Sequence, residues 1–355
     1  MSSLPYLNIV GEVAKFGMVV TLLTNSFLIY LTAYHIQNIK GPYKFLVFLL
    51  AVLGIIFAIM EPFVHAFMHS FNASFVYFSI APMLGAPKAL RTALVLIYSE
   101  IYLLIICVIA IQFVYRMVLI CNSKYIRYFS GWKALWWIAY LTACLALWTV
   151  SAFLNLPNEF SIGYLDEEMM TQFGKNSSDI AGFYSVAYKH IGRVSELQIN
   201  FIISNVLMTI ALVTQYLIIF YSGYKFYCKI KESVDGSSTR NYRIHWQLFK
   251  TLVFQITAPS LFYHVPAFLM FFIPYLDIEI SFPSGVMVSF FSVYPAIDTL
   301  ILILMVQEYH RVIAKILQNT LQKALDWVSQ FTRKSGEAST TQPQTVSSII
   351  SLPVL

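Results

Sequence analysis

The chain has 355 residues, of which 58% are hydrophobic and 11% charged, and its formal net charge is +6. Soluble globular proteins carry about 25% charged residues, so this composition, with a mean hydropathy of +0.69, excludes a water-soluble fold. The positive charge does not indicate nucleic-acid binding, because the basic residues lie in short loops between apolar runs. The sequence therefore predicts a protein of the lipid bilayer.

Seven apolar runs are long enough to cross a bilayer as helices, which takes about 17 to 25 residues each. They cover residues 13–34, 45–66, 92–114, 134–156, 198–220, 251–273 and 285–306. We expect an all-α bundle of seven transmembrane helices over 13–306, preceded by a short extracellular segment, 1–12. The apolar stretch 75–84 is short and contains Pro82, so it is expected to be a loop. The loop 157–197 is long enough to form a lid.

The chain after the last span divides into two predicted segments. Over 307–331, apolar residues recur at helical spacing beside Arg311, Lys315 and Lys323, which predicts an amphipathic helix along the inner membrane surface. Residues 332–355 are rich in Ser and Thr and are expected to be a disordered cytoplasmic tail.

The distribution of Lys and Arg predicts the orientation. On one side of the expected membrane lie 17 of the 23 basic residues, in alternate loops and the C-terminal segment. By the positive-inside rule this side is cytoplasmic, so the N-terminus is outside and the C-terminus inside. The sequons at Asn72 and Asn176 then fall in outer loops, where glycosylation is expected. Seven helices in this orientation form the outline of a G-protein-coupled receptor.

Cysteine and histidine give no sign of a metal or cofactor. Four cysteines lie in spans or inner loops without metal-ligand spacing, so neither a disulfide framework nor a zinc site is expected. His65 and His69 have i, i+4 spacing, but no second pair or acidic cluster completes a zinc site. A structural role is expected for both.

Five short motifs, in order along the chain, carry a family resemblance. They are Asn25–Leu31 (NSFLIYL), Gly41–Lys44 (GPYK), Gln112–Arg116 (QFVYR), Trp246–Lys250 (WQLFK) followed by Gln255 and Pro259, and Tyr294–Asp298 (YPAID). Together they resemble the nematode serpentine chemoreceptors of the Str superfamily, nearest its Str and Srj classes. The pattern departs from the family at Thr299, where proline is common, and at Met117, where an aromatic residue is usual.

This resemblance implies a function and partners. It implies a chemosensory receptor, olfactory in type, for a small and volatile molecule. It also implies coupling to a heterotrimeric G protein and placement in the ciliary membrane of sensory neurons. Membrane lipid is a further expected partner, whereas nucleic acid is not.

Seven residues are candidates for activation and G-protein coupling. Arg116, preceded by Tyr115, ends span three where rhodopsin-like receptors place the arginine that meets the G protein; the alternative is an interfacial arginine. Lys250 fits a G-protein surface or anionic lipid equally well. Pro259 and Pro266 should bend span six. Asp298, beside Pro295, suggests a hinge in span seven, or a static tie to a residue such as Asn25.

A second set of polar and aromatic residues is a candidate ligand pocket. A carboxylate inside a span is costly and should face the bundle interior, and Glu61 and Glu100 lie near the outer ends of their spans. The other candidates are Tyr98, Tyr102, Tyr263, His264 and Tyr294. For each of them a packing or hydrogen-bonding role without ligand contact is the alternative.

Proteins of other classes fit less well. A seven-span transporter or ligand-gated channel is the alternative function, although we find no inverted repeat and insect-type odorant channels have the opposite orientation. A retinal-binding pump needs a lysine in span seven, and 285–306 has none. The histidine boxes and protease motifs of intramembrane enzymes are also missing, so no enzymatic activity is expected.

Overall fold

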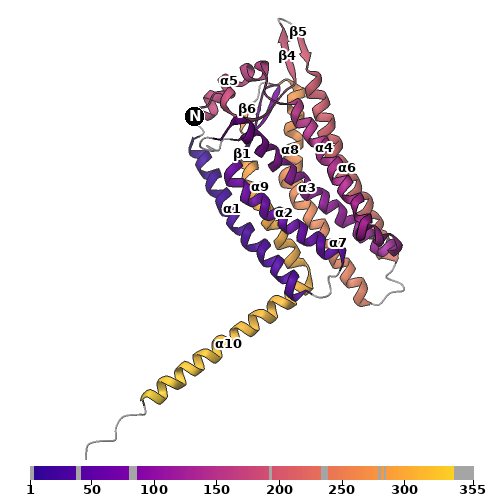
Figure 1. Ribbon diagram of the computed structural model, residues 1–355, viewed down its shortest axis with the longest axis vertical. Coiled ribbons are helices and arrows are strands. Elements are labelled where there is room, and N and C mark those ends of the chain that lie inside the picture. The colour runs from indigo at the N-terminus through magenta and orange to yellow at the C-terminus, as the bar shows by residue number, and fades with distance from the viewer. Residues whose placement is uncertain are drawn as a thin grey trace, which may run out of the picture. The chain divides into compact units, whose positions relative to one another are not determined.

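Figure 1 shows the computed structural model, which describes residues 4–36, 41–79, 86–191, 194–232, 239–278, 281–283 and 285–339. For some residues inside these ranges, Tyr263 among them, only the backbone is described. The chain divides into two units, Met1–Val306 and Gln307–Leu355.

The first unit is a bundle of long helices close to the predicted spans. Their bounds are α1 (Leu4–Tyr30), α2 (Pro42–Val64), α3 (Lys88–Cys121), α4 (Leu135–Leu154), α6 (Ile199–Glu232), α7 (Thr239–Pro259), α8 (Val265–Phe272) and α9 (Gly285–Met305). A π-helical turn, Ser260–His264, joins α7 to α8, so the bundle has seven helical rods among the described residues. A helix satisfies its own backbone hydrogen bonds, as a segment in lipid must.

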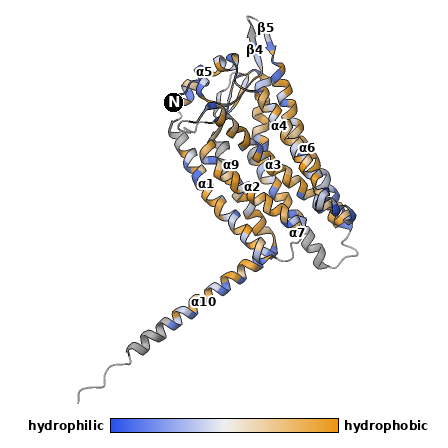
Figure 2. Cartoon of the chain, in the orientation of Figure 1, coloured by the Kyte–Doolittle hydropathy of each residue, from blue (hydrophilic) through white to orange (hydrophobic). Residues whose placement is uncertain are grey.

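Length and hydropathy single out five of these rods as able to cross a membrane, within the described residues. They contain α1, α2, α3, α4 and α6, while the other two rods contribute the shorter apolar helices Val265–Leu276 and Val293–Met305. Figure 2 shows apolar residues over most of the length of the helices.

Helix α3 is the centre of the bundle and packs against α2, α4 and α6. In its most apolar stretch 67% of the residues are buried, compared with 22% for α4. A helix that is apolar on all sides is best placed in the interior of a protein. Side chains of α3 therefore contact several neighbouring helices.

Two prolines interrupt the sixth rod. Pro259 ends α7 and is followed by the π turn, and Pro266 lies in the first turn of α8. Proline cannot donate a backbone hydrogen bond, and π turns within helices are often found at functional sites. The interruption predicted for span six thus takes the form of a π turn between two α-helices.

A β-sheet that the sequence did not predict covers one end of the bundle (Figure 1). Its strands are β1 (Ala66–Phe71), β2 (Ser74–Ser79), β3 (Ala181–Val186) and β6 (Ser281–Pro283), antiparallel in the order β3-β2-β1-β6. The expectation of a loop over 75–84 is therefore wrong for β2, and residues 80–84 lie outside the described residues. A separate hairpin pairs β4 (Tyr188–Ile191) with β5 (Val194–Leu197).

The sheet and helix α5 (Glu159–Phe173) together form what we call the cap, and they bury a small apolar core. Phe67, Val76, Phe78 and Tyr184 on one face of the sheet pack against Leu165, Met169 and Phe173 of α5. Alternate side chains of a strand point to opposite faces, so Met68, Phe75 and Phe183 face the helices instead. Because both faces are buried, the strands lack an alternating polar pattern, and the sequence did not reveal them.

Helix α5 has strong signals at both ends. The Asn158 side chain accepts a hydrogen bond from the backbone N–H of Ser161, and Ser161 Oγ accepts one from the Asn158 N–H, both at 2.9 Å. Such a capping box satisfies two free donors at the start of a helix. Gly174, with φ of 65°, ends the helix in the left-handed conformation. Part of the predicted lid 157–197 is thus this helix.

The second unit contains α10 (Gln307–Ser339). It starts where the amphipathic helix was predicted and extends eight residues beyond the predicted end at 331. Leu317, Leu321, Leu325 and Val328 are exposed along it at helical spacing, as an amphipathic surface helix requires. Residues 340–355 of the predicted tail lie outside the described residues.

Gly182→Ala is expected to destabilise the cap. A Cβ at Gly182 would lie 2.6 Å from Phe78 Cα on the neighbouring strand, and such overpacking costs about 1–3 kcal/mol. The thermal unfolding midpoint of the purified protein in detergent should fall. Gly163→Ala in α5 is the matched control, because a Cβ there meets nothing within 4 Å. Equal midpoints for the two variants would contradict the close approach of β2 and β3.

Candidate functional site

A buried polar cluster links four rods of the bundle at His264. One ring nitrogen of His264 lies 3.0 Å from the Tyr102 hydroxyl of α3, and the other lies 2.8 Å from the Tyr216 hydroxyl of α6. Tyr216 also bonds Ser260 Oγ at 2.7 Å, and the Tyr294 ring of α9 lies 6.3 Å from that of Tyr102. The π turn carries both Ser260 and His264, so a movement of the sixth rod would disturb their hydrogen bonds to Tyr102 and Tyr216.

A second polar pair lies on the same side of α3. Tyr98 donates a hydrogen bond to the Glu61 carboxylate of α2, and both side chains are buried. Phe57 stacks on Tyr98 with ring centroids 4.3 Å apart and lies 6.2 Å from Tyr102. A buried carboxylate needs hydrogen bonds to offset its lost hydration. The structure thus connects four of the predicted pocket residues, Glu61, Tyr98, Tyr102 and His264, and places Tyr294 beside them.

Two predicted pocket residues do not join this group. Glu100 is half-buried and accepts a hydrogen bond from Thr149 Oγ1 at 2.5 Å, so it faces α4. The side chain of Tyr263 lies outside the described residues.

The first and ninth helices are tied together near Pro295. Thr299 Oγ1 donates to Asn25 Oδ1 at 2.8 Å, and Asn25 Nδ2 donates to the Pro295 carbonyl at 3.4 Å. A Cβ on Gly54 of α2 would lie 3.1 Å from Pro295 Cβ, so three helices approach closely here. The tie to Asn25 is made by Thr299 and not by Asp298. Asp298 is buried, and its Oδ1 has no hydrogen-bond partner among the described residues.

A cavity of about 50 Å³ lies between the cap and the helices. Met68, Phe75, Tyr77, Phe183 and Ser185 of the sheet form one wall, and Ser99, Trp148, Ala152, Asn155, Asn205, Met208 and Phe271 of the helices form the rest. Trp148 Nε1 donates to Ser99 Oγ at 2.9 Å. Asn205 is buried, and its Nδ2 has no hydrogen-bond partner among the described residues. An apolar cavity with a few polar groups is typical of small-molecule sites.

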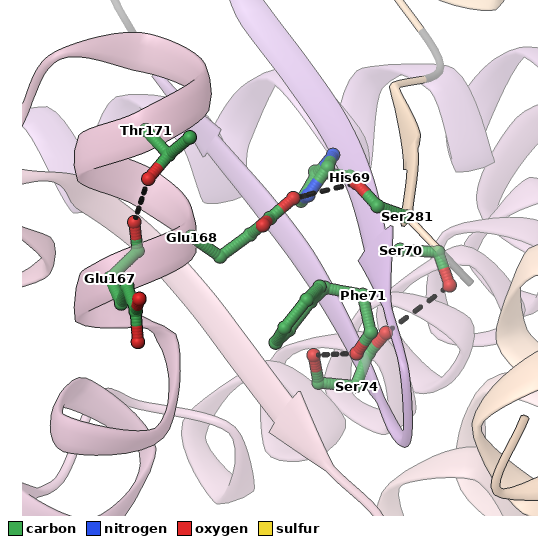
Figure 3. Close-up of polar contacts among 8 residues, drawn as sticks. All are labelled: His69, Ser70, Phe71, Ser74, Glu167, Glu168, Thr171 and Ser281. Carbon is green, nitrogen blue, oxygen red and sulfur yellow. Dashed lines mark hydrogen bonds and ion pairs between the residues drawn. The ribbon is translucent and has the colours of Figure 1, made fainter. Parts of the chain in front are cut away.

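The cap is held closed by a polar contact between α5 and two strands (Figure 3). Glu168 Oε1 lies 3.0 Å from His69 Nε2 of β1 and accepts a hydrogen bond from Ser281 Oγ of β6 at 2.6 Å. His69 is fully buried. Burial holds the pKa of His69 below its ordinary value of 6.5, although the Glu168 carboxylate opposes this. The neutral imidazole is therefore the form that the closed cap favours.

At the opposite end of the bundle, Arg116 lies against an aromatic ring. Its guanidinium carbon is 3.6 Å from the centroid of Tyr43, at the start of α2, and both residues are buried. Tyr115 also stacks on Tyr43, with centroids 5.8 Å apart. A cation over the face of an aromatic ring is stabilised by about 2 kcal/mol or more when desolvated. The Tyr43 ring thus lies where a carboxylate partner of Arg116 would be expected. The sequence alone did not reveal this contact.

The other predicted switch residue at this end is Lys250. It is exposed, and its Nζ lies 5.6 Å from the Trp246 ring. The described part of the chain contains no group of three side chains that could hold a metal ion. His65 and His69 do not share a helix face, because α2 ends at Val64 and β1 begins at Ala66.

Comparison with known proteins identifies the family. The family model of the serpentine type 7TM GPCR chemoreceptor Str matches residues 11–314. The chain belongs to this family. It is 36% identical over 303 residues to the G-protein coupled receptor str-33 of Caenorhabditis elegans, covering 84% of this chain and 87% of that protein. It is 26% identical over 327 residues to the serpentine receptor class r-10 of the same organism, covering 89% and 93%.

The fold is also that of a known receptor structure. The structure of this Str chemoreceptor resembles the crystal structure of squid rhodopsin with a TM-score of 0.55 and 12% identity, covering 96% of this chain and 93% of that one. The predicted seven-helix receptor fold and the family resemblance are therefore confirmed. The protein is a multi-pass membrane protein of a receptor family, not of an enzyme family, and the family implies a ligand and a G protein in general terms.

Several residues of the site were missed in the sequence. Tyr216 and Asn205 are polar groups inside span five, which is itself a signal because such groups are costly in lipid. Tyr43 belongs to the Gly-Pro-Tyr motif, but nothing local indicates that it meets Arg116. The cavity wall could not be found without the sheet.

Acidification is expected to loosen α5 from the sheet. Burial in the closed cap lowers the pKa of His69, so His69 binds a proton more readily when the cap is open. The closed cap is therefore favoured at pH values above about 6.5 and becomes less stable as the pH falls below that value. Hydrogen–deuterium exchange of α5, corrected for intrinsic rates, should quicken a few fold between about pH 7.5 and about pH 5.5.

His69→Gln should remove this pH dependence, since glutamine donates to Glu168 without titrating. His65→Gln is the necessary control, because burial also lowers the pKa of His65. Slower exchange of α5 at acidic pH would instead mean that a charged His69–Glu168 pair holds the cap.

Proposed function

We propose that this protein is a chemosensory receptor, olfactory in type, that binds a small, volatile and weakly polar molecule beneath the cap. The observation that supports this most directly is the cavity between the sheet and α3, α4, α6 and α8. Helix α3 connects the cavity to the polar cluster, because Ser99 lines the cavity and Tyr102 of the cluster lies about one helical turn further along the same helix.

The cavity wall indicates the chemistry of the ligand. Phe75, Phe183 and Phe271 offer apolar contacts, and Asn205 Nδ2 offers a hydrogen-bond donor that no described residue uses. A buried donor without an acceptor is costly, so a ligand that carries an acceptor oxygen gains affinity by meeting it. A ligand with a formal charge does not fit, because the lining contains no charged side chain among the described residues.

The size of the cavity indicates how the ligand enters. A volume of about 50 Å³ holds only one or two water molecules. An odorant of several heavy atoms therefore requires the sheet to shift away from the helices, and α5, which is joined to the sheet by its apolar core and by the contacts of Glu168, shifts with it. A ligand that binds the shifted state more tightly moves the equilibrium towards it.

The cluster around His264 is the route by which this shift reaches the sixth rod. Tyr102 of α3 and Tyr216 of α6 bond to His264 in the π turn. A displacement of α3 or α6 therefore changes the hydrogen bonds that position this turn. We propose that the half of the sixth rod away from the cap then moves outward. Arg116 leaves Tyr43 in that state, and a G protein binds in the opened space.

The cap end is proposed to be extracellular and the Arg116 end cytoplasmic. Basic residues that include Lys44, Arg116 and Lys250 lie at the opposite end from the cap, in accord with the positive-inside rule. Asn72 and Asn176 both belong to the cap end, in the β1–β2 turn and before η4 (Ser177–Asp179). The ciliary membrane of a sensory neuron is the proposed location, by analogy with the family.

A calcium assay with a promiscuous G protein and a panel of volatile compounds tests the function. The wild type should respond to a compound on the panel, and Arg116→Ala should lose at least about 90% of that response at equal surface expression. Tyr43→Leu should raise ligand-independent activity several fold, because it removes the ring that holds Arg116, whereas Tyr43→Phe keeps the ring and should behave as wild type.

Two outcomes would contradict the proposal. A ligand-gated current that persists without any G protein would indicate a channel. Full signalling by Arg116→Ala would show that this arginine is not needed for G-protein coupling, and it would leave the receptor function itself uncontradicted.

Glycosylation tests the orientation independently of any ligand. Asn176 is exposed, whereas Asn72 is half-buried in a tight turn, so Asn176 should be the more fully used sequon. Asn176→Gln should abolish most of the glycosidase-sensitive shift of the protein on a gel, and Asn72→Gln should change it little. A glycan that maps to the opposite end of the bundle would reverse the orientation.

A further inference from the structure

A second hollow lies on the outer surface of the bundle, away from the cap and the polar cluster. It has a volume of about 320 Å³ and lies between α3, α4, α6 and the 3₁₀ helix η2 (Ser123–Phe129). We call it the lateral groove. It is lined by Ala110, Ile111, Val114, Tyr128, Trp136, Trp137, Tyr140 and Ile218. The neighbouring Leu217 and Phe220 are exposed, so this face of the bundle meets the hydrocarbon of the membrane.

The aromatic wall of the lateral groove is fixed by its own contacts. Trp137 donates from Nε1 to the Tyr128 carbonyl at 3.0 Å and stacks on Phe129 with centroids 4.8 Å apart. Tyr140 donates a hydrogen bond to Gln215 of α6. Side chains held in this way lose little further freedom on binding, which favours a preformed site.

Two cations flank the mouth of the groove. The Arg127 guanidinium carbon lies 5.6 Å, and Lys133 Nζ lies 5.2 Å, from the ring centroid of Tyr128, which itself lines the groove. Arg127 is exposed and Lys133 half-buried. Neither has a carboxylate partner in the ion pairs among the described residues. The groove therefore combines an apolar channel with two positive charges at one end.

The lining of the lateral groove covers a short length of each helix. On α3 it runs from Ala110 to Val114 and on α4 from Trp136 to Tyr140, which is about 6 Å along each helix axis. Half of the hydrocarbon core is about 15 Å thick. The apolar lining is therefore long enough to contact the part of an acyl chain nearest the headgroup.

We infer that the lateral groove is a binding site for an anionic glycerophospholipid of the leaflet at the η2 end. One acyl chain lies along Ile111, Val114 and Ile218, and the phosphate meets Arg127 and Lys133. The two charges argue for this occupant over a sterol, which is uncharged and supplies no anionic group to either cation. The inference needs only that the bundle spans a membrane, and it does not depend on the chemosensory ligand.

The test uses full-length receptor purified in a neutral detergent and titrated with phosphatidylserine or phosphatidylcholine of the same acyl chains. Bound lipid is counted by native mass spectrometry. Two cations at the membrane surface should give wild type about a 30-fold preference for phosphatidylserine. Arg127→Gln with Lys133→Gln should reduce this preference to near unity. Lys124→Gln with Lys225→Gln removes the same charge elsewhere at this end and should leave the preference unchanged.

A second pair of variants tests the channel itself. Val114→Trp fills the groove and should reduce tightly bound lipid of either kind at least about tenfold, while Leu217→Trp adds the same bulk to the exposed face and should not. An unchanged phosphatidylserine preference in the double glutamine variant would overturn the inference. So would unchanged lipid binding by Val114→Trp, or displacement of phosphatidylserine by an equimolar sterol.

Discussion

The requirement that no polar group enter the hydrocarbon unpaired shapes the whole molecule. It selects helices for the spans, since a helix closes its own backbone hydrogen bonds. It also decides where the polar side chains lie. Glu61 is bonded to Tyr98, Asn25 to Thr299, and His264 to Tyr102 and Tyr216. Each of these contacts joins two different helices. Backbone groups thus find their hydrogen-bond partners within a helix, and polar side chains find theirs on neighbouring helices.

These contacts divide the interior into two levels with different properties. Near the cap, the cavity contains a buried amide donor, Asn205 Nδ2, without a partner among the described residues. In the middle, His264 uses both ring nitrogens. A satisfied cluster is rigid and a partly satisfied one is poised to accept another group. In the proposed mechanism the level near the cap responds to the ligand and the level in the middle transmits its effect.

The sequence predicted the membrane bundle well because run length and charge are local properties. It also singled out Glu61, Tyr98, Tyr102, His264 and Tyr294 as candidates, since polar residues in apolar runs are conspicuous, and these side chains lie close together in the bundle, whereas none of them lines the cavity beneath the cap. The cap was missed because Phe67 and Val76 lie in strands buried on both faces, which have no alternating pattern. The partner of Arg116 was missed for a different reason: Tyr43 is distant along the chain, and only the packing of α2 on α3 brings the two together.

The cap is assembled without a covalent cross-link. All four cysteines, Cys107, Cys121, Cys144 and Cys228, are free thiols, and none belongs to the sheet or to α5. The cap is therefore indifferent to thiol reductants, and its folding needs no oxidising enzyme. The opening proposed for the cap needs only apolar packing and the contacts of Glu168 to break and re-form, whereas a disulfide would hold the segment permanently in place.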